Sequence, residues 1–185
     1  FTDNTLQGNQ SYRLLYFTNL DSLNLSGNQI TENQSRITLI EISGNSLNIL
    51  NNVIDENGNV SNYGGGSALR ITDSDGQCFI DNNQITHHDG YQDGGGIFVY
   101  NSIGLQITGN VISHNAVSNQ GGSIYVQNGN VSIVNNTITS NSSNYGSAVY
   151  IDISGNVEIQ ENIITNNTGE YAIWGAPGVL TQNNI

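Results

Sequence analysis

The amino-acid sequence predicts an all-β fold: a right-handed parallel β-helix (β-solenoid) of about seven coils of roughly 26 residues, with three short strands per coil. Three observations lead to this prediction. An asparagine recurs at the coil interval, two columns of aliphatic residues keep a fixed distance from it, and glycine-rich segments recur between the strands. Repetition at such a period is typical of proteins that stack one structural unit upon another.

The recurrent asparagine is followed two residues later by a branched aliphatic residue. Asn tolerates the left-handed backbone conformation that a corner needs. Stacked Asn side chains can also form hydrogen bonds from coil to coil. The predicted ladder consists of Asn4, Asn28, Asn52, Asn83, Asn110, Asn136, Asn162 and Asn184. A second asparagine usually follows five residues later, and His88 takes its place once.

Two aliphatic columns precede the ladder and are expected to face the core, because the residues alternate with the period of a strand. Five residues before the ladder position lie Leu23, Leu47, Cys78, Leu105, Val131, Val157 and Val179. Three residues before it lie Leu25, Ile49, Ile80, Ile107, Ile133 and Ile159, with Thr181 as the exception. Cys78 is therefore expected to be a small core hydrophobe.

Glycine-rich segments lead into a further strand in several coils. The glycines are Gly64–Gly66, Gly94–Gly96 and Gly121–Gly122, and the strands are expected at Ser67–Thr72, Ile97–Tyr100, Ser123–Gln127 and Ala148–Ile153. Residues 1–185 are thus predicted to form a single β-solenoid domain. Both ends fall in mid-repeat, so we expect either a fragment of a longer chain or a subunit that stacks end to end.

The charge balance narrows the classes of partner. The chain has 15 acidic residues, three arginines and no lysine, and its formal charge is −12. Such a field repels nucleic acids and anionic membranes, and no apolar run is long enough to span a bilayer. We expect end-to-end self-association, or contact with a host or cell-surface protein or a glycan. The near absence of trypsin sites suits a secreted or cell-surface protein.

The asparagine and glycine motifs resemble those of a known group. Asn110-Val111-Ile112 with Asn115, followed by Gly121-Gly122-Ser123-Ile124, is similar to the right-handed parallel β-helix repeat (pectin-lyase-like) superfamily. Within it, the rhythm resembles surface proteins and autotransporter passengers. The resemblance covers essentially the whole chain and implies the fold. It implies less about function, because this fold is shared by lyases, hydrolases, epimerases, tailspikes and adhesins.

The first candidate site is a column expected to face outward from the glycine-led strands. It contains Glu41 and Arg70, which would form an ion pair between rungs, and the aromatic residues Tyr16, Phe98, Tyr125, Tyr150 and Trp174. Rows of aromatic rings suit sugar rings or a partner protein. The alternative is that these residues protect a flat sheet by stacking on one another.

A second candidate site combines His87, His88, Asp89 and Asp93 with His114, which is expected near His87 on the next rung. Such groups could hold a divalent metal or act as an acid/base pair. However, His88 fills a corner-asparagine position, and Asp-Gly segments are ordinary turn chemistry. Asp73 and Asp75 are weaker candidates for calcium ligands. No cofactor is expected, and calcium is left open.

Catalysis is the alternative function. The resemblance implies that a lyase would need an Arg or Lys base beside calcium-binding acids. It implies that a hydrolase would need an Asp cluster with Gly-His-Gly and Arg-Ile-Lys motifs, which the sequence lacks. The alternative catalytic set is Arg70, Asp73, Asp75, His88 and Asp89.

Two functional hypotheses follow. The favoured one is an extracellular or cell-surface structural or adhesive β-solenoid that contacts its partner through the aromatic column and can assemble end to end into a fibre. The alternative is a carbohydrate-active β-helix enzyme (lyase, hydrolase or epimerase) or a glycan-binding module.

Overall fold

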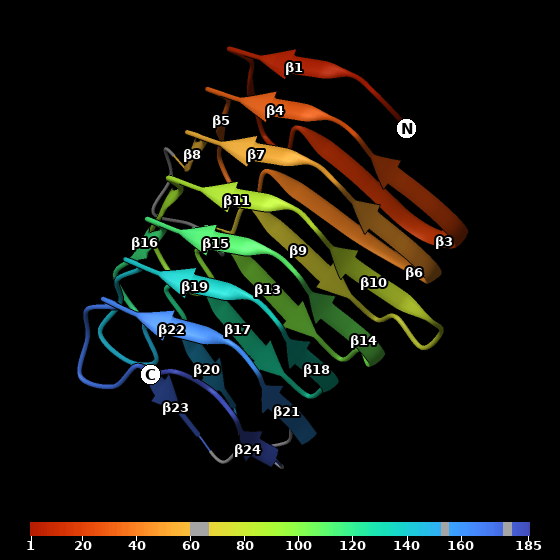
Figure 1. Ribbon diagram of the computed structural model, residues 1–185. Helices are drawn as coiled ribbons and strands as arrows, with labels where there is room; N and C mark the ends of the chain where they lie inside the picture. The colour runs from red at the N-terminus through yellow and green to blue at the C-terminus, as the bar shows by residue number, and fades with distance from the viewer. Residues whose placement is uncertain (60–66, 153–155, 176–178) are drawn as a thin grey trace.

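The computed structural model describes residues 1–59, 67–152, 156–175 and 179–185, and the elements in this part of the chain are parallel β-strands (Figure 1). The chain winds into a right-handed coil whose strands stack into three sheets. The prediction of an all-β parallel solenoid is therefore confirmed. The seven strands of one sheet enclose six complete turns, against the seven coils expected.

The seven-stranded sheet follows the ladder asparagines. Its central residues, from Leu6 to Ile164, pair in register from rung to rung. Its strands are β1 (Thr5–Gln7), β4 (Gln29–Thr31), β7 (Val53–Asp55), β11 (Gln84–Thr86), β15 (Val111–Ser113), β19 (Thr137–Thr139) and β22 (Ile163–Thr165).

The twelve-stranded sheet has two limbs, joined through β3 (Leu15–Ser26) and β6 (Ile40–Leu50). The first limb contains β9 (Leu69–Thr72), β13 (Ile97–Tyr100), β17 (Ile124–Gln127), β20 (Val149–Ile151) and β23 (Ile173–Trp174). The second limb contains β10 (Cys78–Asp81), β14 (Ile103–Thr108), β18 (Asn130–Val134), β21 (Asn156–Gln160) and β24 (Val179–Thr181).

A third sheet of two-residue strands follows the seven-stranded sheet along the chain in the first five coils. It contains β2 (Gln10–Ser11), β5 (Gln34–Ser35), β8 (Gly58–Asn59), β12 (Asp89–Gly90) and β16 (Ala116–Val117). The strands per coil thus differ from the predicted three: β7 to β10, β11 to β14 and β15 to β18 are sets of four, whereas β19 to β21 and β22 to β24 are sets of three. Gly64–Gly66 and Ile153, which the sequence assigned to a glycine segment and to a strand end, lie outside the described residues.

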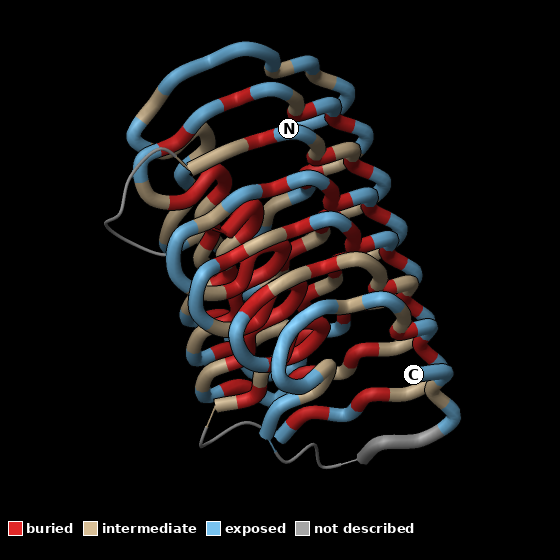
Figure 2. Tube along the Cα trace, turned by 90° about the vertical axis from the view of Figure 1, so that its left-hand side faces the viewer, coloured by how far each residue is buried: buried red, intermediate tan, exposed pale blue. Residues whose placement is uncertain are grey.

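The core is a continuous stack of buried aliphatic residues. Figure 2 shows the buried positions recurring from coil to coil along the trace. Leu47, Cys78 and Leu105 pair in register and are buried, and Ile49, Ile80 and Ile107 do the same two residues later. Both predicted inward columns are therefore confirmed over most of their length. Because each rung pairs with the next without a shift in this region, every inward residue meets a similar residue above and below it.

The asparagine ladder runs through the corner between the second limb and the seven-stranded sheet. The Nδ2 of Asn110 donates to the Oδ1 of Asn136 at 3.0 Å, and the backbone N–H of Asn110 donates to the same oxygen at 2.9 Å. The same pair of bonds links each ladder residue to the next, beginning at Asn4. Buried asparagine hydrogen-bond ladders thus hold the rungs in register.

The structure corrects the residue predicted at the last position of the ladder. Asn162 donates to the Oδ1 of Asn183 at 3.0 Å, so Asn183 and not Asn184 ends the ladder. The backbone register explains this, because Thr181 pairs with Gln160 and Leu180 pairs with Ile159. The predicted alignment of Val179 with Val157 and of Thr181 with Ile159 was therefore wrong by one residue.

The structure also corrects which residue has the left-handed backbone conformation at the corner. The ladder residues themselves do not have positive φ; the residue before each of them does, as at Asn51 (φ 57°), Asn82 (φ 54°) and Asn135 (φ 57°). At Gly109 (φ 66°) a Cβ would come within 2.7 Å of the Asn82 side chain. The left-handed residue turns the chain, and the asparagine after it is free to use its amide in the ladder.

A second ladder follows five residues later. Its Asn33, Asn57, Asn115 and Asn141 are buried, and the Nδ2 of Asn33 donates to the Oδ1 of Asn57 at 3.0 Å. His88 occupies the place between Asn57 and Asn115, as the sequence predicted, and its backbone N–H donates to the Oδ1 of Asn115 at 3.1 Å.

Candidate functional site

The outward aromatic column has the register that the sequence predicted. Tyr16, Glu41 and Arg70 pair in succession across β3, β6 and β9. Phe98, Tyr125, Tyr150 and Trp174 continue the column across β13, β17, β20 and β23. The strands of the first limb therefore place these side chains in one line along the outside of the coil.

The rings in the centre of this column stack on each other. Phe98 and Tyr125 have ring centroids 4.9 Å apart and planes 9° apart, and the Tyr125 and Tyr150 centroids are 5.1 Å apart. Phe98 and Tyr125 are each only 6% exposed. Their faces are thus covered by neighbouring rings, as the alternative interpretation of the column expected, and they offer little surface to a ligand.

The two arginines at the N-terminal end of the column also contact aromatic rings. The guanidinium of Arg70 lies 4.2 Å from the centre of the Phe98 ring, and that of Arg13 lies 4.7 Å from the centre of the Tyr16 ring. Arg13 forms the ion pair with Glu41, at 2.5 Å between Nε and Oε2. Arg70 feels the charge of Glu41, but burial outweighs this attraction and lowers the pKa of Arg70.

Exposed aromatic residues lie at the C-terminal end of the column. Tyr145, Tyr171 and Trp174 are 37%, 44% and 38% exposed. The Trp174 centroid lies 4.8 Å from that of Tyr171 and 5.5 Å from that of Tyr145, with tilted planes. We call these three residues the terminal aromatic cluster. Tyr150 stacks beneath Trp174 with planes 12° apart and supports its ring.

Tyr145 and Tyr171 were missed at the sequence level. They precede β20 and β23 and lie outside these strands, so the alternation of a strand does not mark them. The signal that could have found them is their spacing, because the two tyrosines lie one coil apart and each comes just before a strand of the first limb.

Two carboxylates lie beside Tyr125. Its hydroxyl donates to the Oδ2 of Asp152 at 3.4 Å, and Nε2 of Gln127 donates to the same oxygen at 2.9 Å. Burial raises the pKa of Asp93, although Asn119 donates a hydrogen bond to it. Burial and then the charges of Asp152 and Asp93 raise the pKa of Tyr125 strongly, so the phenol remains a donor.

The alternative catalytic residues do not form one site. Arg70 lies on the first limb over Phe98, and Asp73 lies at the next corner, where it accepts a hydrogen bond from Asn101 at 2.7 Å. His88 and Asp89 follow β11, beyond two further strands. The His88 ring is buried and directed to backbone carbonyls inside the coil, so it cannot reach a substrate on the surface.

His87 and His114 meet on adjacent rungs, as expected. Their rings stack with centroids 4.8 Å apart and planes 16° apart, and Nδ1 of His87 lies 2.9 Å from the Oδ1 of Asp55. Burial would raise the pKa of Asp55, but hydrogen bonds from Thr86 and His87 outweigh it and lower this pKa.

The geometry does not favour a metal at this histidine pair, because nearly parallel rings cannot direct two in-plane lone pairs at one ion. In the described parts of the chain, no group of three or more His, Cys, Asp or Glu residues has the geometry of a metal site. The calcium interpretation of Asp73 and Asp75 stays a prediction.

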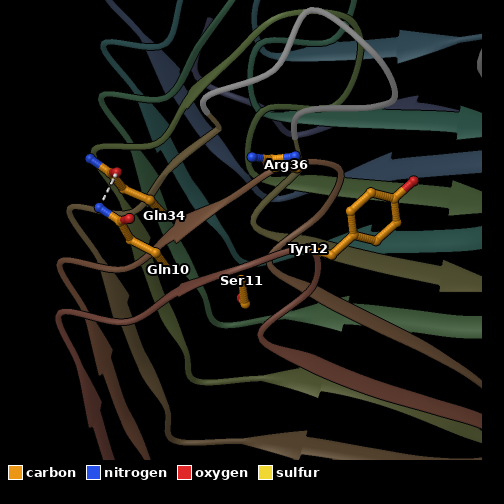
Figure 3. Close-up of a pocket in the computed structure, with 5 residues that line it drawn as sticks. All are labelled: Gln10, Ser11, Tyr12, Gln34 and Arg36. Carbon is orange, nitrogen blue, oxygen red and sulfur yellow. Dashed lines mark hydrogen bonds between the residues drawn. The ribbon is translucent and has the colours of Figure 1, made fainter.

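A cavity of about 400 Å³ lies at the third sheet, between Gln10, Ser11, Tyr12, Gln34 and Arg36 (Figure 3). The amides of Gln10 and Gln34 point to one side and form a hydrogen bond of 3.2 Å, while the Tyr12 ring points to the other. These side chains do not converge on a common point, so we do not assign the cavity a ligand.

A family model described as the right handed beta helix region matches residues 95–185. Searches of curated proteins and of solved structures give no match. The match covers just under half of the chain, and it agrees with the parallel solenoid described above. Among the residues with described structure, no helix is long and apolar enough to cross a membrane.

Proposed function

We propose that this right-handed β-helix repeat protein is a rigid structural or adhesive module of the cell surface or extracellular space, in the manner of the surface-protein and autotransporter-passenger branch. The observation that carries the proposal is the terminal aromatic cluster. Three partly exposed rings contact one another at one place on the surface, and Tyr150 stacks on the Trp174 ring. Exposed aromatic residues on a rigid support are the usual anchors of protein and glycan contacts.

The rest of the molecule suits a scaffold better than a catalyst. The candidate acids and bases are separated, and Arg70 is stacked on Phe98. The net charge of −12 keeps such a module apart from nucleic acids and anionic lipids. The proposed partners are therefore a surface protein or a glycan, and end-to-end association into a fibre stays a prediction.

The double variant Trp174→Ala/Tyr171→Ala should weaken attachment by about tenfold or more, because it removes two anchor rings of the cluster. Attachment is measured by binding of labelled protein to printed glycans and to immobilised extracellular proteins. Both residues lie outside the buried core, so the melting temperature should change little.

Tyr91→Ala is the matched control. Tyr91 is 47% exposed and lies outside the cluster, so its loss should leave attachment within about twofold. Equal binding by the double variant and by the wild type would contradict the assignment of the cluster. Replacement of Tyr125 is less informative, since that residue is buried and would report stability.

A further inference from the structure

The N-terminal end of the aromatic column combines rings, arginines and a carboxylate. The Arg13 guanidinium lies 4.7 Å from the centre of the Tyr16 ring and forms an ion pair with Glu41. The Arg70 guanidinium lies 4.2 Å from the centre of the Phe98 ring and interacts electrostatically with Glu41. Each arginine thus has both an aromatic face and a carboxylate charge as neighbours, two kinds of group that bind guanidinium.

The C-terminal end of the same column has rings and carboxylates, but the chain supplies no arginine or lysine there. The chain has no lysine, and its three arginines, Arg13, Arg36 and Arg70, all lie within the first 70 residues. In the parts of the chain that the structure describes, neither Asp93 nor Glu170 forms an ion pair. The terminal aromatic cluster therefore lies in a segment of one sign of charge.

Two carboxylates adjoin this cluster. That of Glu170 accepts a hydrogen bond from the Tyr171 hydroxyl, and this bond is the main cause of the raised pKa of Tyr171. Burial and then the charge of Asp152 raise the pKa of Tyr150. Tyr150 in turn stacks on the Trp174 ring. Exposed ring surface and negative charge thus occur together at this end of the column.

A third carboxylate lies close to these groups and is half-buried. Asp93 interacts with Asp152, and both charges act on Tyr150. Burial raises the pKa of Asp93, and the charge of Asp152 adds to this rise. Neighbouring carboxylates outside bulk water repel each other, and a cation bound beside them offsets that repulsion. The charge distribution around the rings therefore favours a positively charged ligand.

We propose that the terminal aromatic cluster binds an arginine side chain from a basic segment of a partner protein. The guanidinium stacks on the exposed Trp174 and Tyr171 rings and donates hydrogen bonds to the Glu170 carboxylate. Arginine fits better than lysine because its planar group both stacks and forms paired hydrogen bonds. This inference rests on the proposed function, since it takes the cluster as the contact surface, and it specifies a basic protein as the partner.

The fluorescence of Trp174 reports on this site directly, because Trp174 is the only tryptophan in the chain. A hexa-arginine peptide, added at physiological ionic strength, should change this fluorescence in a saturable manner. Hexalysine should bind more weakly by about threefold or more. Hexacitrulline has the shape of hexa-arginine without its charge, and it should leave the fluorescence unchanged.

Paired charge variants test the carboxylates. Glu170→Gln/Asp152→Asn should weaken hexa-arginine binding by about tenfold or more. Glu170→Gln alone, at an exposed residue, should weaken it by about threefold. The control Glu158→Gln/Glu161→Gln removes the same amount of charge from exposed residues on and just after β21, and its binding should stay within about twofold. Circular dichroism checks that each variant is folded.

The inference is overturned if hexa-arginine leaves the fluorescence of Trp174 unchanged, or if hexacitrulline acts as hexa-arginine does. Equal weakening by the two double charge variants would also overturn it, because binding would then follow net charge alone. The attachment assay keeps the two proposals apart. If Trp174→Ala/Tyr171→Ala abolishes attachment to a glycan while hexa-arginine does not bind, the arginine inference fails and the cluster remains the contact surface. If hexa-arginine binds but attachment does not depend on the cluster, the proposed function fails and the arginine site stands.

Discussion

Replacement of Asn110 by alanine should lower the free energy of unfolding by about 3–5 kcal/mol, because several buried polar groups lose their partners at once. The Nδ2 of Asn110 donates to Asn136 and to the carbonyl oxygens of Ile80 and Thr108, at 2.8–3.0 Å. Its Oδ1 accepts both the backbone N–H and the Nδ2 of Asn83. Each unpaired buried group costs about 1–3 kcal/mol, and partial relaxation reduces the sum.

Urea unfolding followed by circular dichroism measures this loss. Asn24→Ala is the control, since Asn24 is exposed on β3 and we expect a change below about 0.5 kcal/mol there. A loss at Asn110 no larger than at Asn24 would mean that the ladder does not hold the rungs together.

Acid should destabilise the protein through His88, with a loss of about 3 kcal/mol as the pH falls from 6.5 to 4. Burial lowers the pKa of His88 to about 4 from its ordinary value of 6.5, although the carbonyl oxygens of Ile54 and Asn57 oppose this. The folded protein therefore keeps the ring neutral where the unfolded chain has already taken up a proton. The contribution of neutral His88 to the free energy of unfolding is fully present above pH 6.5 and is lost as the pH falls toward 4.

His88→Asn tests this account. Asparagine supplies the Oδ1 that the second ladder lacks at this place, where the backbone N–H of Asn57 would meet it. The variant should lose the acid-dependent part of the unfolding free energy between pH 6.5 and 4. The lowered pKa of Asp55 acts below its ordinary value of 3.8, outside this window. If wild type and variant show the same pH dependence, His88 is not the group that titrates.

Much of the fold follows from the sequence, because a solenoid repeats its constraints. The outward aromatic column has the predicted register, and so do the ladder and the inward aliphatic columns up to the last coil. The prediction failed at Asn184 because Asn183 and Asn184 are adjacent. The pattern alone cannot choose between them, and the pairing of Thr181 with Gln160 decides.

The sequence predicted which residues align in the outward column, but it did not predict how their side chains pack. The register places Phe98 and Tyr125 in line, but sequence spacing does not reveal that their rings stack face to face and cover one another. Register placed Arg70 beside Glu41, but the ion pair of Glu41 is formed by Arg13, whose side chain reaches it from the segment before β3. Tyr145 and Tyr171 lie outside the strands of the first limb, so strand alternation does not mark them, and only their spacing of one coil does. Secretion, partners and calcium binding stay predictions.

The exchange of Asn side-chain amide protons with deuterium, followed by NMR, tests the ladder most directly. The Nδ2 protons of buried Asn52, Asn83 and Asn110 should persist far longer than those of exposed Asn24, because they exchange only when rungs separate. The Nδ2 protons of Asn183 should be protected more than those of Asn184, because the Nδ2 of Asn183 donates to the carbonyl oxygen of Ile159. Rapid exchange at all these positions would contradict a coil held together by buried asparagine ladders.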